Sequence, residues 1–393
     1  MLNRPEGLRI CIYCHQFRPF QGGVQTSTQH LAHHLTNRGH KVVVVTATPK
    51  SPGWCPPFDL IHRPSKKQLA RIFASADLVH CQGFALLPII LAILSSRPVV
   101  WGHHDYDLLC PKGVAWYDGP CSFGLAKCVG NLRRDHPWYL VVGLIATYFI
   151  RLLLQRHPRI KHLSHSGFVR DHNGPRFSTV LHYGILPLSA DWNHATYQAI
   201  KSDKPPSFVF LGRLIPEKGC HVLLEALNSP QLRELGAQAT IIGDGPMRET
   251  LRELAEKYQL ADRVRFLGHL EGSEVWTELV ASTAVVIPSI WDEPYGMVAI
   301  EAMELGVPVV ASRVGGLSEP VGLGGLLFER NDASGLAETL ARLALDSSLR
   351  EELVRTGKEV ASQHHWTRLS ESYEKFYKAV VEDRQVVANM VPM

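Results

Sequence analysis

The chain has 393 residues, which at roughly 100–200 residues per domain predicts two domains with room for two buried cores. Hydrophobic residues make up 45% and charged residues 20%, an ordinary globular composition that excludes wholesale disorder. The formal net charge of +4 is too small to indicate a nucleic-acid-binding protein.

The start of the chain, its cysteines and its longest apolar run indicate the cell compartment. The first seven residues include Pro5 and Glu6 and contain no apolar h-region, so we expect no signal peptide and a cytoplasmic protein. The 8 cysteines are then expected to be reduced thiols. The longest apolar run, 138–150, ends at Arg151 and is shorter than the ~20 residues that cross a bilayer.

Apolar strands alternate with helical patterns through the first half of the chain. Residues 42–45 are four valines in a row, which favours a parallel strand buried on both faces. The alternation predicts a parallel sheet covered by helices on both sides. Strands are expected over 8–14, 41–47, 77–80, 98–103, 160–165 and 178–181, and helices over 24–38, 66–75, 84–95 and 137–155.

The pattern stops over 186–206, which is rich in Pro, Ser, Asp and Lys and is expected to be an interdomain linker. It then restarts. The predicted class is α/β, with two Rossmann-like, doubly wound parallel-sheet domains over 1–185 and 207–366 and a ligand cleft between them. In the second domain, strands are expected over 207–211, 239–242, 264–267, 284–288, 307–312 and 326–328, and helices over 219–227, 247–258, 273–281, 297–305, 333–345, 348–363 and 366–381.

Two glycine turns are candidates for phosphate binding. Gly22-Gly23 opens the first helix, where backbone N–H groups can approach an anion. Gly243-Asp244-Gly245-Pro246 has the same position in the second domain. Neither has Gly-x-Gly-x-x-Gly spacing, so plain tight turns are the alternative. One such turn in each domain fits a ligand with a diphosphate better than either turn alone.

Charged residues follow two strands of the second domain. Arg213 and Lys218 can neutralise a diphosphate leaving group without a metal, although ordinary exposed charges are the alternative for this segment alone. Glu293 precedes a Pro-Tyr-Gly turn, and Glu301 lies about two turns into the next helix. The two carboxylates can hold two sets of sugar hydroxyls. A helix cap at Glu293 with Glu301 in solvent is the alternative, weakened by the apolar neighbours of Glu301.

These segments together resemble the retaining glycosyltransferases of the GT-B fold, family 4 (glycosyltransferase group 1), which use nucleotide-sugar donors. The resemblance covers nearly the whole chain and is strongest over 207–320. It rests on FLGRLIPEKG (210–219), IGDGP (242–246), VRFLG (264–268), and Glu-x7-Glu followed by GVPVVAS (306–312).

The resemblance implies a role for each matching residue. Arg213 and Lys218 would bind the donor diphosphate, Glu293 the sugar hydroxyls and Glu301 the ribose, while 266–270 would border the base. His104-Asp105 would face the sugar; the choice of His104 over His103 depends on the Asp that follows. The implied catalytic set is His104, Asp105, Arg213, Lys218 and Glu293, and the donor-binding set is Gly22, Gly23, Arg213, Lys218, Gly243, Asp244, Leu267, Leu270, Glu293, Tyr295, Gly296, Met297 and Glu301.

The resemblance also implies a reaction. A hexose-type sugar would move from a nucleoside diphosphate, UDP being favoured over GDP, to a hydroxyl of a glycan, a lipid-linked glycan or a small molecule. No metal or cofactor would be needed, because the cations stabilise the leaving group. The helix after Trp366, about 367–393, would cross back onto the first domain. The alternatives are a nucleotide-sugar 2-epimerase of the same fold and a non-catalytic sugar-binding protein.

Cysteines in two places require an interpretation. Cys11 and Cys14 have redox spacing but lie inside a predicted strand, so core thiols are favoured. Cys110, Cys121 and Cys128 lie in a long insertion over 105–136. A metal site there is the alternative, which the lack of a Cys-x2-Cys pair disfavours. A loop of that length after His104-Asp105 is expected to shape the acceptor pocket.

The helix expected over 138–154 is apolar almost all round. Arg133 and Arg134 precede it, and Arg156 and Arg159 follow it. Such a helix is either buried in the fold or docked on an anionic leaflet, which would place the first domain at the inner face of a membrane near a lipid-linked acceptor. The sequence leaves both interpretations open.

Overall fold

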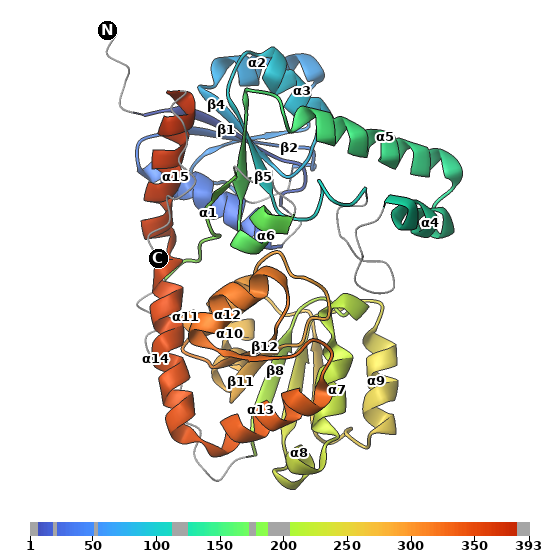
Figure 1. The fold of residues 1–393 in the computed structure, drawn as a ribbon. Helices are drawn as coiled ribbons and strands as arrows, with labels where there is room; N and C mark the ends of the chain where they lie inside the picture. Colours follow the sequence, from blue (N-terminus) through green and yellow to red (C-terminus); the bar gives the residue numbers. More distant parts are fainter. Residues whose placement is uncertain are drawn as a thin grey trace. The chain divides into compact units, whose positions relative to one another are not determined.

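The computed structural model describes residues 7–18, 22–50, 54–111, 125–172, 178–187 and 205–382 (Figure 1). It forms two compact units, Met1–Tyr117 with Cys121–Leu186 and His364–Met393, and Asp118–Pro120 with Pro187–Gln363. Most of the expected linker, Cys121 and the chain after Glu382 lie outside the described residues.

The first unit contains a parallel sheet in the order β3-β2-β1-β4-β5-β6-β7. The chain starts in the middle, winds outward to β3 and then returns to the other side of β1, which makes the sheet doubly wound. The strands are β1 (Arg9–Cys14), β2 (Lys41–Thr46), β3 (Asp59–His62), β4 (Leu78–Gln82), β5 (Val99–His103), β6 (Ile160–Ser164) and β7 (Thr179–Val180).

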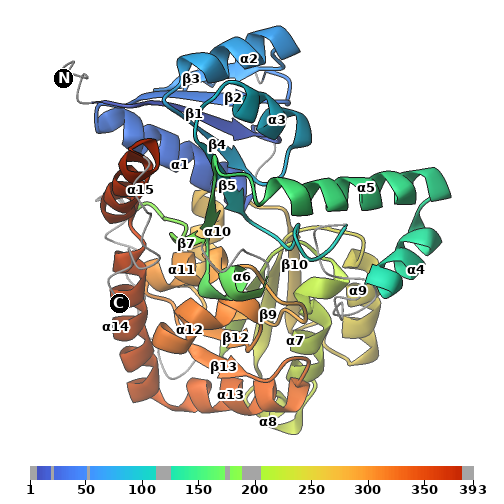
Figure 2. The ribbon, with the colours of Figure 1, turned by 45° about the horizontal axis from the view of Figure 1, so that its top comes forward.

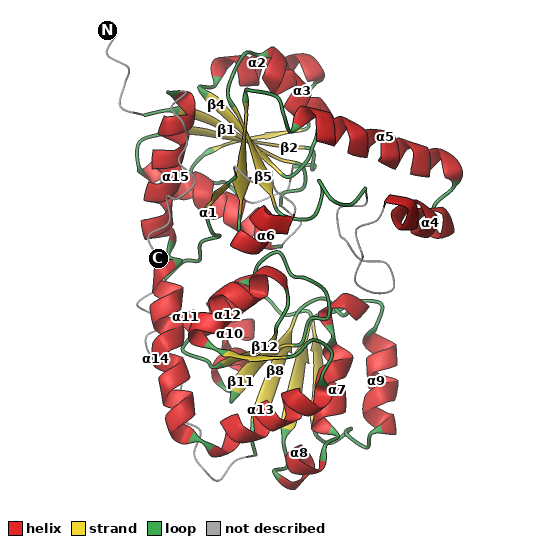
Figure 3. Ribbon diagram, in the orientation of Figure 1, coloured by secondary structure: helices red, strands yellow, loops and turns green. Residues whose placement is uncertain are grey.

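Helices cover both faces of this sheet (Figures 1 and 3). Alternate residues of β1 explain why its sequence is apolar throughout: Ile10, Ile12 and Cys14 join the cluster under α1, whereas Cys11 and Tyr13 join the cluster under α2 and α3. The helices are α1 (Gly23–Asn37), α2 (Lys66–Ser75), α3 (Leu86–Leu94), α4 (Leu125–Asp135), α5 (Trp138–Leu154), α6 (Gly167–His172) and α15 (Trp366–Val381).

The expectation of core thiols in β1 is confirmed. Cys11 and Cys14 are buried and belong to the clusters on the two opposite faces of the sheet. Burial raises the pKa of the Cys14 thiol to about 12 and that of Cys11 still further. Both residues are therefore neutral packing groups at physiological pH.

The second unit repeats the winding with a parallel sheet in the order β10-β9-β8-β11-β12-β13. The predicted α/β class with two doubly wound parallel sheets is confirmed. Its strands are β8 (Ser207–Leu211), β9 (Gln238–Ile242), β10 (Val264–Gly268), β11 (Ala284–Ile287), β12 (Val309–Ser312) and β13 (Leu326–Phe328). Its helices are α7 (Cys220–Leu227), α8 (Pro230–Glu234), α9 (Arg248–Lys257), α10 (Ser273–Val280), α11 (Met297–Glu304), α12 (Ser318–Gly324), α13 (Ala333–Leu345) and α14 (Ser347–Gln363), with short 3-10 helices η2 (Pro216–Lys218) and η3 (Gly315–Leu317).

The structure adds elements that the pattern did not predict. Helix α4 lies inside the insertion expected as a loop over 105–136, and it buries Cys128 and Leu132, which are one turn apart. Strand β3 is a short edge strand with only partly buried residues, so its apolar alternation is weak. Within the described ranges, no helix combines the length and apolarity needed to cross a membrane.

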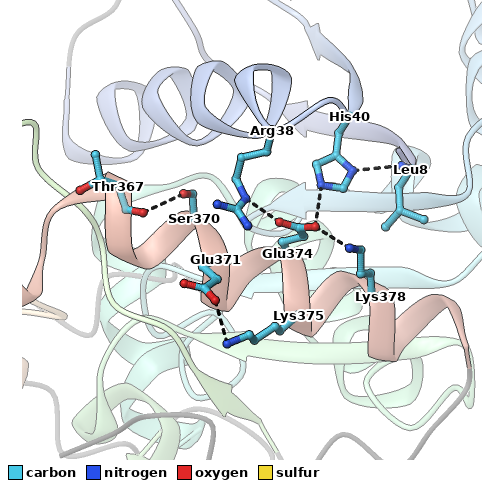
Figure 4. A network of polar contacts seen from close by, with 9 residues as sticks. All are labelled: Leu8, Arg38, His40, Thr367, Ser370, Glu371, Glu374, Lys375 and Lys378. Atoms are coloured by element: carbon cyan, nitrogen blue, oxygen red, sulfur yellow. Dashed lines mark hydrogen bonds and ion pairs between the residues drawn. The ribbon is translucent and has the colours of Figure 1, made fainter. Parts of the chain in front are cut away.

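Helix α15 packs in the first unit, where Trp366, Tyr373, Phe376 and Tyr377 are buried in the same cluster as α1. A polar network fixes its outer side (Figure 4). The Glu374 carboxylate accepts hydrogen bonds from Arg38 Nε at 2.5 Å and Lys378 Nζ at 2.5 Å. His40 Nε2 lies 3.6 Å from Glu374 Oε1, and His40 Nδ1 accepts from the Leu8 N–H. One carboxylate therefore links α15 to α1 and to the start of β1.

We expect Glu374→Gln to lower the free energy of unfolding by about 1–2 kcal/mol at pH 7. Burial raises the pKa of Glu374, but the hydrogen bonds from Lys378 and Arg38 outweigh it, so the net pKa is lowered. The contribution is therefore present above the ordinary value of 4.5 and lost as the pH falls through the lowered pKa. Urea unfolding of both proteins across this range checks the prediction; a difference that stays constant down to pH 3 would contradict it.

Candidate functional site

Every strand of the second unit is parallel, so the loops that follow the strands meet at one edge of the sheet. Most of the donor residues predicted in this unit lie on these loops or at the start of the helix that follows one. Gly212–Gly219 follows β8, Gly243–Pro246 follows β9, and residues 288–296 lie between β11 and α11. The segment from Arg313 to η3 follows β12.

Lys218 and Glu293 form an ion pair. Lys218 Nζ donates to Glu293 Oε1 at 2.6 Å, and the buried Ser289 hydroxyl donates to the same oxygen at 2.5 Å. Glu293 is only 8% exposed, and Oε2 accepts no hydrogen bond from the described part of the chain. The structure therefore brings together two residues that lie far apart in the sequence, and it leaves Oε2 of Glu293 without a hydrogen-bond partner among the described residues.

A glycine contact makes this pairing possible. Gly219 has φ +65°, and a Cβ there would lie 1.9 Å from the Pro288 carbonyl oxygen. The Ile290 N–H donates to the Glu217 carbonyl at 2.9 Å. The loop after β8 and the loop after β11 are thus joined backbone to backbone, which places Lys218 opposite Glu293.

Two further loops fix the Glu293 segment. The Gly316 N–H donates to the Glu293 carbonyl at 2.7 Å, and the Gly315 N–H donates to Asp292 Oδ1 at 3.2 Å. Gly315 has φ +45°, and a Cβ there would lie 2.4 Å from the Glu293 carbonyl oxygen. Arg330, from the loop after β13, pairs with Asp292. Loops after four strands therefore meet at the segment of Asp292 and Glu293.

Glu301 has a different environment. It lies on α11, is partly exposed, and receives no hydrogen bond to its carboxylate from any described residue. Burial raises the pKa of Glu301 to about 7. Gly296 and Met297 stand at the N-terminus of the same helix, where backbone N–H groups lack helical partners, and the Tyr295 side chain is buried beside them.

The other predicted donor residues are spread over the same edge. Arg213 is exposed, and Asp244 is exposed and pairs with Arg248 at 2.9 Å. Gly243 has φ +129°, and a Cβ there would lie 1.9 Å from the Gly212 carbonyl oxygen, so close loop packing accounts for this glycine. Leu267 in β10 and Leu270 beyond it are half-buried.

In the first unit, Gly22 is the residue before α1 and Gly23 is its first residue. At the end of β5 the structure separates the two adjacent histidines. His103 is fully buried, with Nε2 2.9 Å from His162 Nδ1 and Nδ1 3.3 Å from Asp107 Oδ1. His104 is partly exposed, stacks on His165 at 4.4 Å, and forms a hydrogen bond with the Tyr183 hydroxyl. Of the two, only His104 is partly exposed.

Burial and the neighbouring His165 lower the pKa of His104 well below its usual value, so this ring is neutral at physiological pH. Asp105 follows it and accepts a hydrogen bond from the Asp107 N–H at 3.1 Å. Burial and the Asp107 carboxylate raise the pKa of Asp105 well above its usual range. The structure thus places a neutral imidazole and a weakly acidic carboxyl group side by side.

Two polar residues near His104 were not predicted. His80 Nε2, Gln82 Oε1 and His104 Nε2 are buried without hydrogen-bond partners in the described structure. All three approach Gly102, where a Cβ would lie 3.0, 3.4 and 3.2 Å from them, respectively. His80 and Gln82 are polar residues on the otherwise apolar strand β4, which is the sequence signal that could have identified them.

The first unit also contains a cavity of about 500 Å³ at the carboxyl ends of β1, β2 and β4. Its lining includes the polar residues Tyr13, His15, Thr46 and Arg63 and the apolar residues Phe84 and Leu87. Cys110 and Cys128 are buried free thiols. The described ranges contain no group of His, Cys, Asp or Glu side chains arranged to hold a metal ion.

Glu301→Gln separates a ligand-binding role from a structural one. If the ionised carboxylate accepts from ribose hydroxyls, nucleoside diphosphate affinity should fall by about 1.5–3 kcal/mol in the variant at pH 8. The difference between the two proteins should shrink as the pH falls through about 7, because wild-type Glu301 becomes protonated. Calorimetric titration of both proteins with the same nucleoside diphosphate measures this difference. Protonation of the phosphate affects both titrations equally and therefore cancels in the difference.

The free energy of unfolding of Glu301→Gln should not fall together with its nucleotide affinity. A raised carboxyl pKa makes its stabilising contribution complete below 4.5 and lost as the pH rises through about 7. Glu301→Gln should therefore match or exceed the wild type in unfolding free energy at pH 8. A variant that loses stability and retains nucleotide affinity would contradict the assignment.

The two adjacent histidines provide a matched pair of variants. We expect His104→Gln to slow turnover of a nucleotide-sugar by roughly 10–100-fold with little change in melting temperature. His103→Gln should instead lower the free energy of unfolding by about 1–3 kcal/mol, because it removes the buried contacts of the His103 ring with His162 and Asp107. Equal losses of activity in the two variants, at equal stability, would show that the exposed position of His104 has no functional meaning.

Comparisons with known proteins agree with this geometry. Residues 196–360 match the family model "Glycosyl transferases group 1", and residues 21–163 match the model "Glycosyltransferase Family 4". An uncharacterized glycosyltransferase of Methanocaldococcus jannaschii is 31% identical over 214 residues, which is 52% of this chain and 54% of that protein. Several other curated relatives are likewise matched over only about half of their length.

Longer matches are more distant. The phosphatidylinositol N-acetylglucosaminyltransferase gpi3 subunit of Schizosaccharomyces pombe is 24% identical over 392 residues, covering 94% of this chain and 80% of that protein. The structure of Anabaena HepE in complex with UDP and glucose superposes with a TM-score of 0.68 at 19% identity, over 95% of this chain and 100% of that one. Such a likeness establishes a shared fold. The chain belongs to the group 1 glycosyltransferases of family 4.

Proposed function

We propose that the chain is a retaining glycosyltransferase that moves a hexose-type sugar from a nucleoside diphosphate to an acceptor hydroxyl without a metal. UDP-sugars are favoured over GDP-sugars, and the acceptor is a glycan, a lipid-linked glycan or a small molecule. The observation that carries the proposal is the Lys218–Glu293 pair at the edge of a parallel sheet, with the unpaired carboxylate of Glu301 on the following helix.

The proposed donor site uses each charge differently. Lys218 and the exposed Arg213 stabilise the negative charge that develops as the diphosphate leaves. Glu293, fixed by Lys218 and Ser289 through one oxygen, accepts sugar hydroxyls with the other. Glu301 accepts from the ribose hydroxyls. Lys218 contacts Glu293 as well as the diphosphate in this proposal. The same cation therefore positions the residue that holds the sugar and stabilises the leaving group.

In the first unit we propose that the neutral His104 and the adjacent Asp105 contact the donor sugar. His80 and Gln82 present unpartnered polar atoms toward the same backbone position and would hold a sugar hydroxyl or an ordered water beside it. The acceptor enters the cavity between Arg63 and Phe84. Its hydroxyl attacks the anomeric carbon on the face that the diphosphate leaves, and the departing phosphate oxygen takes the proton.

Relatives support this assignment by their names. Anabaena HepE was solved with UDP and glucose, and a relative from Mycobacterium tuberculosis is a glycogen synthase. The Schizosaccharomyces relative is named for transfer to phosphatidylinositol. We place the enzyme in the cytoplasm, with the first unit in peripheral contact with the inner face of a membrane.

Arg213→Ala and Lys218→Ala should each lower donor turnover by roughly 10²–10³-fold. Their stabilities should differ, because Arg213 is exposed whereas Lys218 is the cation that neutralises Glu293. Arg213→Ala should unfold within about 0.5 kcal/mol of the wild type. The exposed Lys257 on α9 provides the control, since Lys257→Ala removes a cation away from the strand-end loops.

The measurement is release of nucleoside diphosphate from a panel of nucleotide-sugars, with and without candidate acceptors and in the presence of EDTA. Turnover that persists in EDTA supports cation-assisted departure, and a strict need for Mg²⁺ contradicts it. Conversion of one nucleotide-sugar into its 2-epimer, without diphosphate release, would instead identify the epimerase. Binding without any turnover would identify a sugar-binding protein.

A further inference from the structure

Helix α5 is exposed to solvent along nearly its whole length. Only Val141 and Arg151 are buried, while Leu153 is 73% exposed and Trp138 is 71% exposed. A helix that is apolar almost all round and packed in a core would show the opposite pattern. The interpretation of α5 as a buried helix is therefore wrong. The exposed large apolar residues of α5 are Trp138, Tyr139, Leu140, Val142, Phe149, Ile150 and Leu153.

Helix α3 extends this apolar surface. Leu87, Ile90 and Leu94 are exposed and follow helical spacing, so they lie on one face of α3. The C-terminal ends of α3 and α5 meet, because Arg159 Nη1 donates to the Ile93 carbonyl at 3.0 Å and Leu154 packs on the same cluster as Ile93. Of the 13 exposed large apolar residues in the described structure, all but Leu186, Leu323 and Leu345 belong to these two helices.

The charged residues within the segments that carry this surface are cations. The sequence from His136 to Arg170 contains no Asp or Glu, and Arg156 and Arg159 are exposed just after α5. Helix α2, which packs against α3, exposes Lys66, Lys67 and Arg71, and residues 60–76 also lack acidic side chains. Figures 1 and 2 show α2, α3 and α5 following one another along the first unit.

The combination selects among possible occupants. A second copy of this chain would bring cations against cations, which opposes self-association through this surface. An anionic bilayer matches both properties, since its phosphates attract the Lys and Arg side chains and its acyl boundary accepts the apolar ones. Trp138 and Tyr139 at the N-terminal end of α5 are the residue types that favour the headgroup level.

We propose that α2, α3 and α5 form a docking face for an anionic lipid bilayer. The apolar side chains of α3 and α5 enter the headgroup–acyl boundary, and the cations of α2 and of the segment after α5 contact lipid phosphates. The proposal rests on the membrane contact of the proposed function and deepens it by naming the surface and the lipid charge. Leu87 belongs both to this face and to the wall of the cavity, so docking would bring the acceptor cavity to the membrane.

The test is flotation of the full chain with vesicles of phosphatidylcholine alone or with about a third phosphatidylglycerol. We expect binding to the anionic vesicles, strongest at low salt, and little binding to the neutral ones. The combined variant Leu94→Ser, Phe149→Ser, Leu153→Ser should lower the partition coefficient by about tenfold or more. The combined variant Lys66→Gln, Lys67→Gln, Arg71→Gln should do the same and flatten the salt dependence.

Matched controls are available in the second unit. Leu323 and Leu345 are each 73% exposed, so Leu323→Ser with Leu345→Ser removes equally exposed apolar groups elsewhere and should leave vesicle binding unchanged. Lys257→Gln does the same for a cation. All substituted residues are exposed, so unchanged circular dichroism and melting temperature are expected and confirm that a loss of binding is not a loss of folding.

Three outcomes would overturn the proposal. The first is that the wild type does not float with either vesicle. The second is that the control variants lose as much binding as the test variants. The third is a dimer in light scattering that dissociates in the variant of Leu94, Phe149 and Leu153. Diphosphate release from soluble donor, measured without vesicles, tests the proposed function separately. A chain that binds anionic vesicles and turns over no donor would refute the glycosyltransferase proposal and leave the docking face standing.

Discussion

Parallel pairing of every strand is the constraint on which both halves of the candidate site depend. It gathers the loops that follow the strands at one edge of each sheet, so residues distant in the sequence become neighbours. The edge alone does not bring Lys218 to Glu293, however. Gly219 lets the loop after β8 touch the backbone at Pro288, and Gly315 lets the loop after β12 touch the backbone at Glu293. Gly219 and Gly315 therefore allow the loop contacts that place Lys218 beside Glu293.

The carboxylates at this edge are prepared for different partners. Glu293 already has a cation and a hydroxyl on one oxygen, so it is oriented before any ligand arrives. Glu301 has neither, and burial keeps its pKa near 7. A ligand that donates hydrogen bonds to Glu301 would stabilise its ionised form, and binding would release a proton whenever the free carboxyl was protonated. His80 and His104 in the first unit resemble Glu301 in this respect. Both rings are neutral, and each has a nitrogen without a partner in the described structure.

Sequence patterns predicted the features that follow from burial of a segment in the core. The strands of both sheets are apolar because they are covered on two faces, and Cys11 and Cys14 were assigned to the core for that reason. Patterns failed where several parts of the chain must meet. The approach of His80, Gln82 and His104 to Gly102 depends on β4 lying beside β5, which no local pattern encodes. The exposure of α5 was equally inaccessible, because an apolar helix has the same composition whether its neighbours are protein or lipid.

Helix α3 connects the two surfaces of the first unit. Its N-terminal residues Leu86, Leu87 and Pro88 line the cavity, while Leu87, Ile90 and Leu94 form its exposed face. A soluble acceptor would gain nothing from a cavity wall that continues into an exposed apolar surface, which is costly to hydrate. An acceptor with a polar head and an apolar tail would use both, the head beside Arg63 and His15 and the tail along α3. Under the proposed function, the continuity of the two surfaces would suit a lipid-linked acceptor better than a free glycan or a small polar molecule.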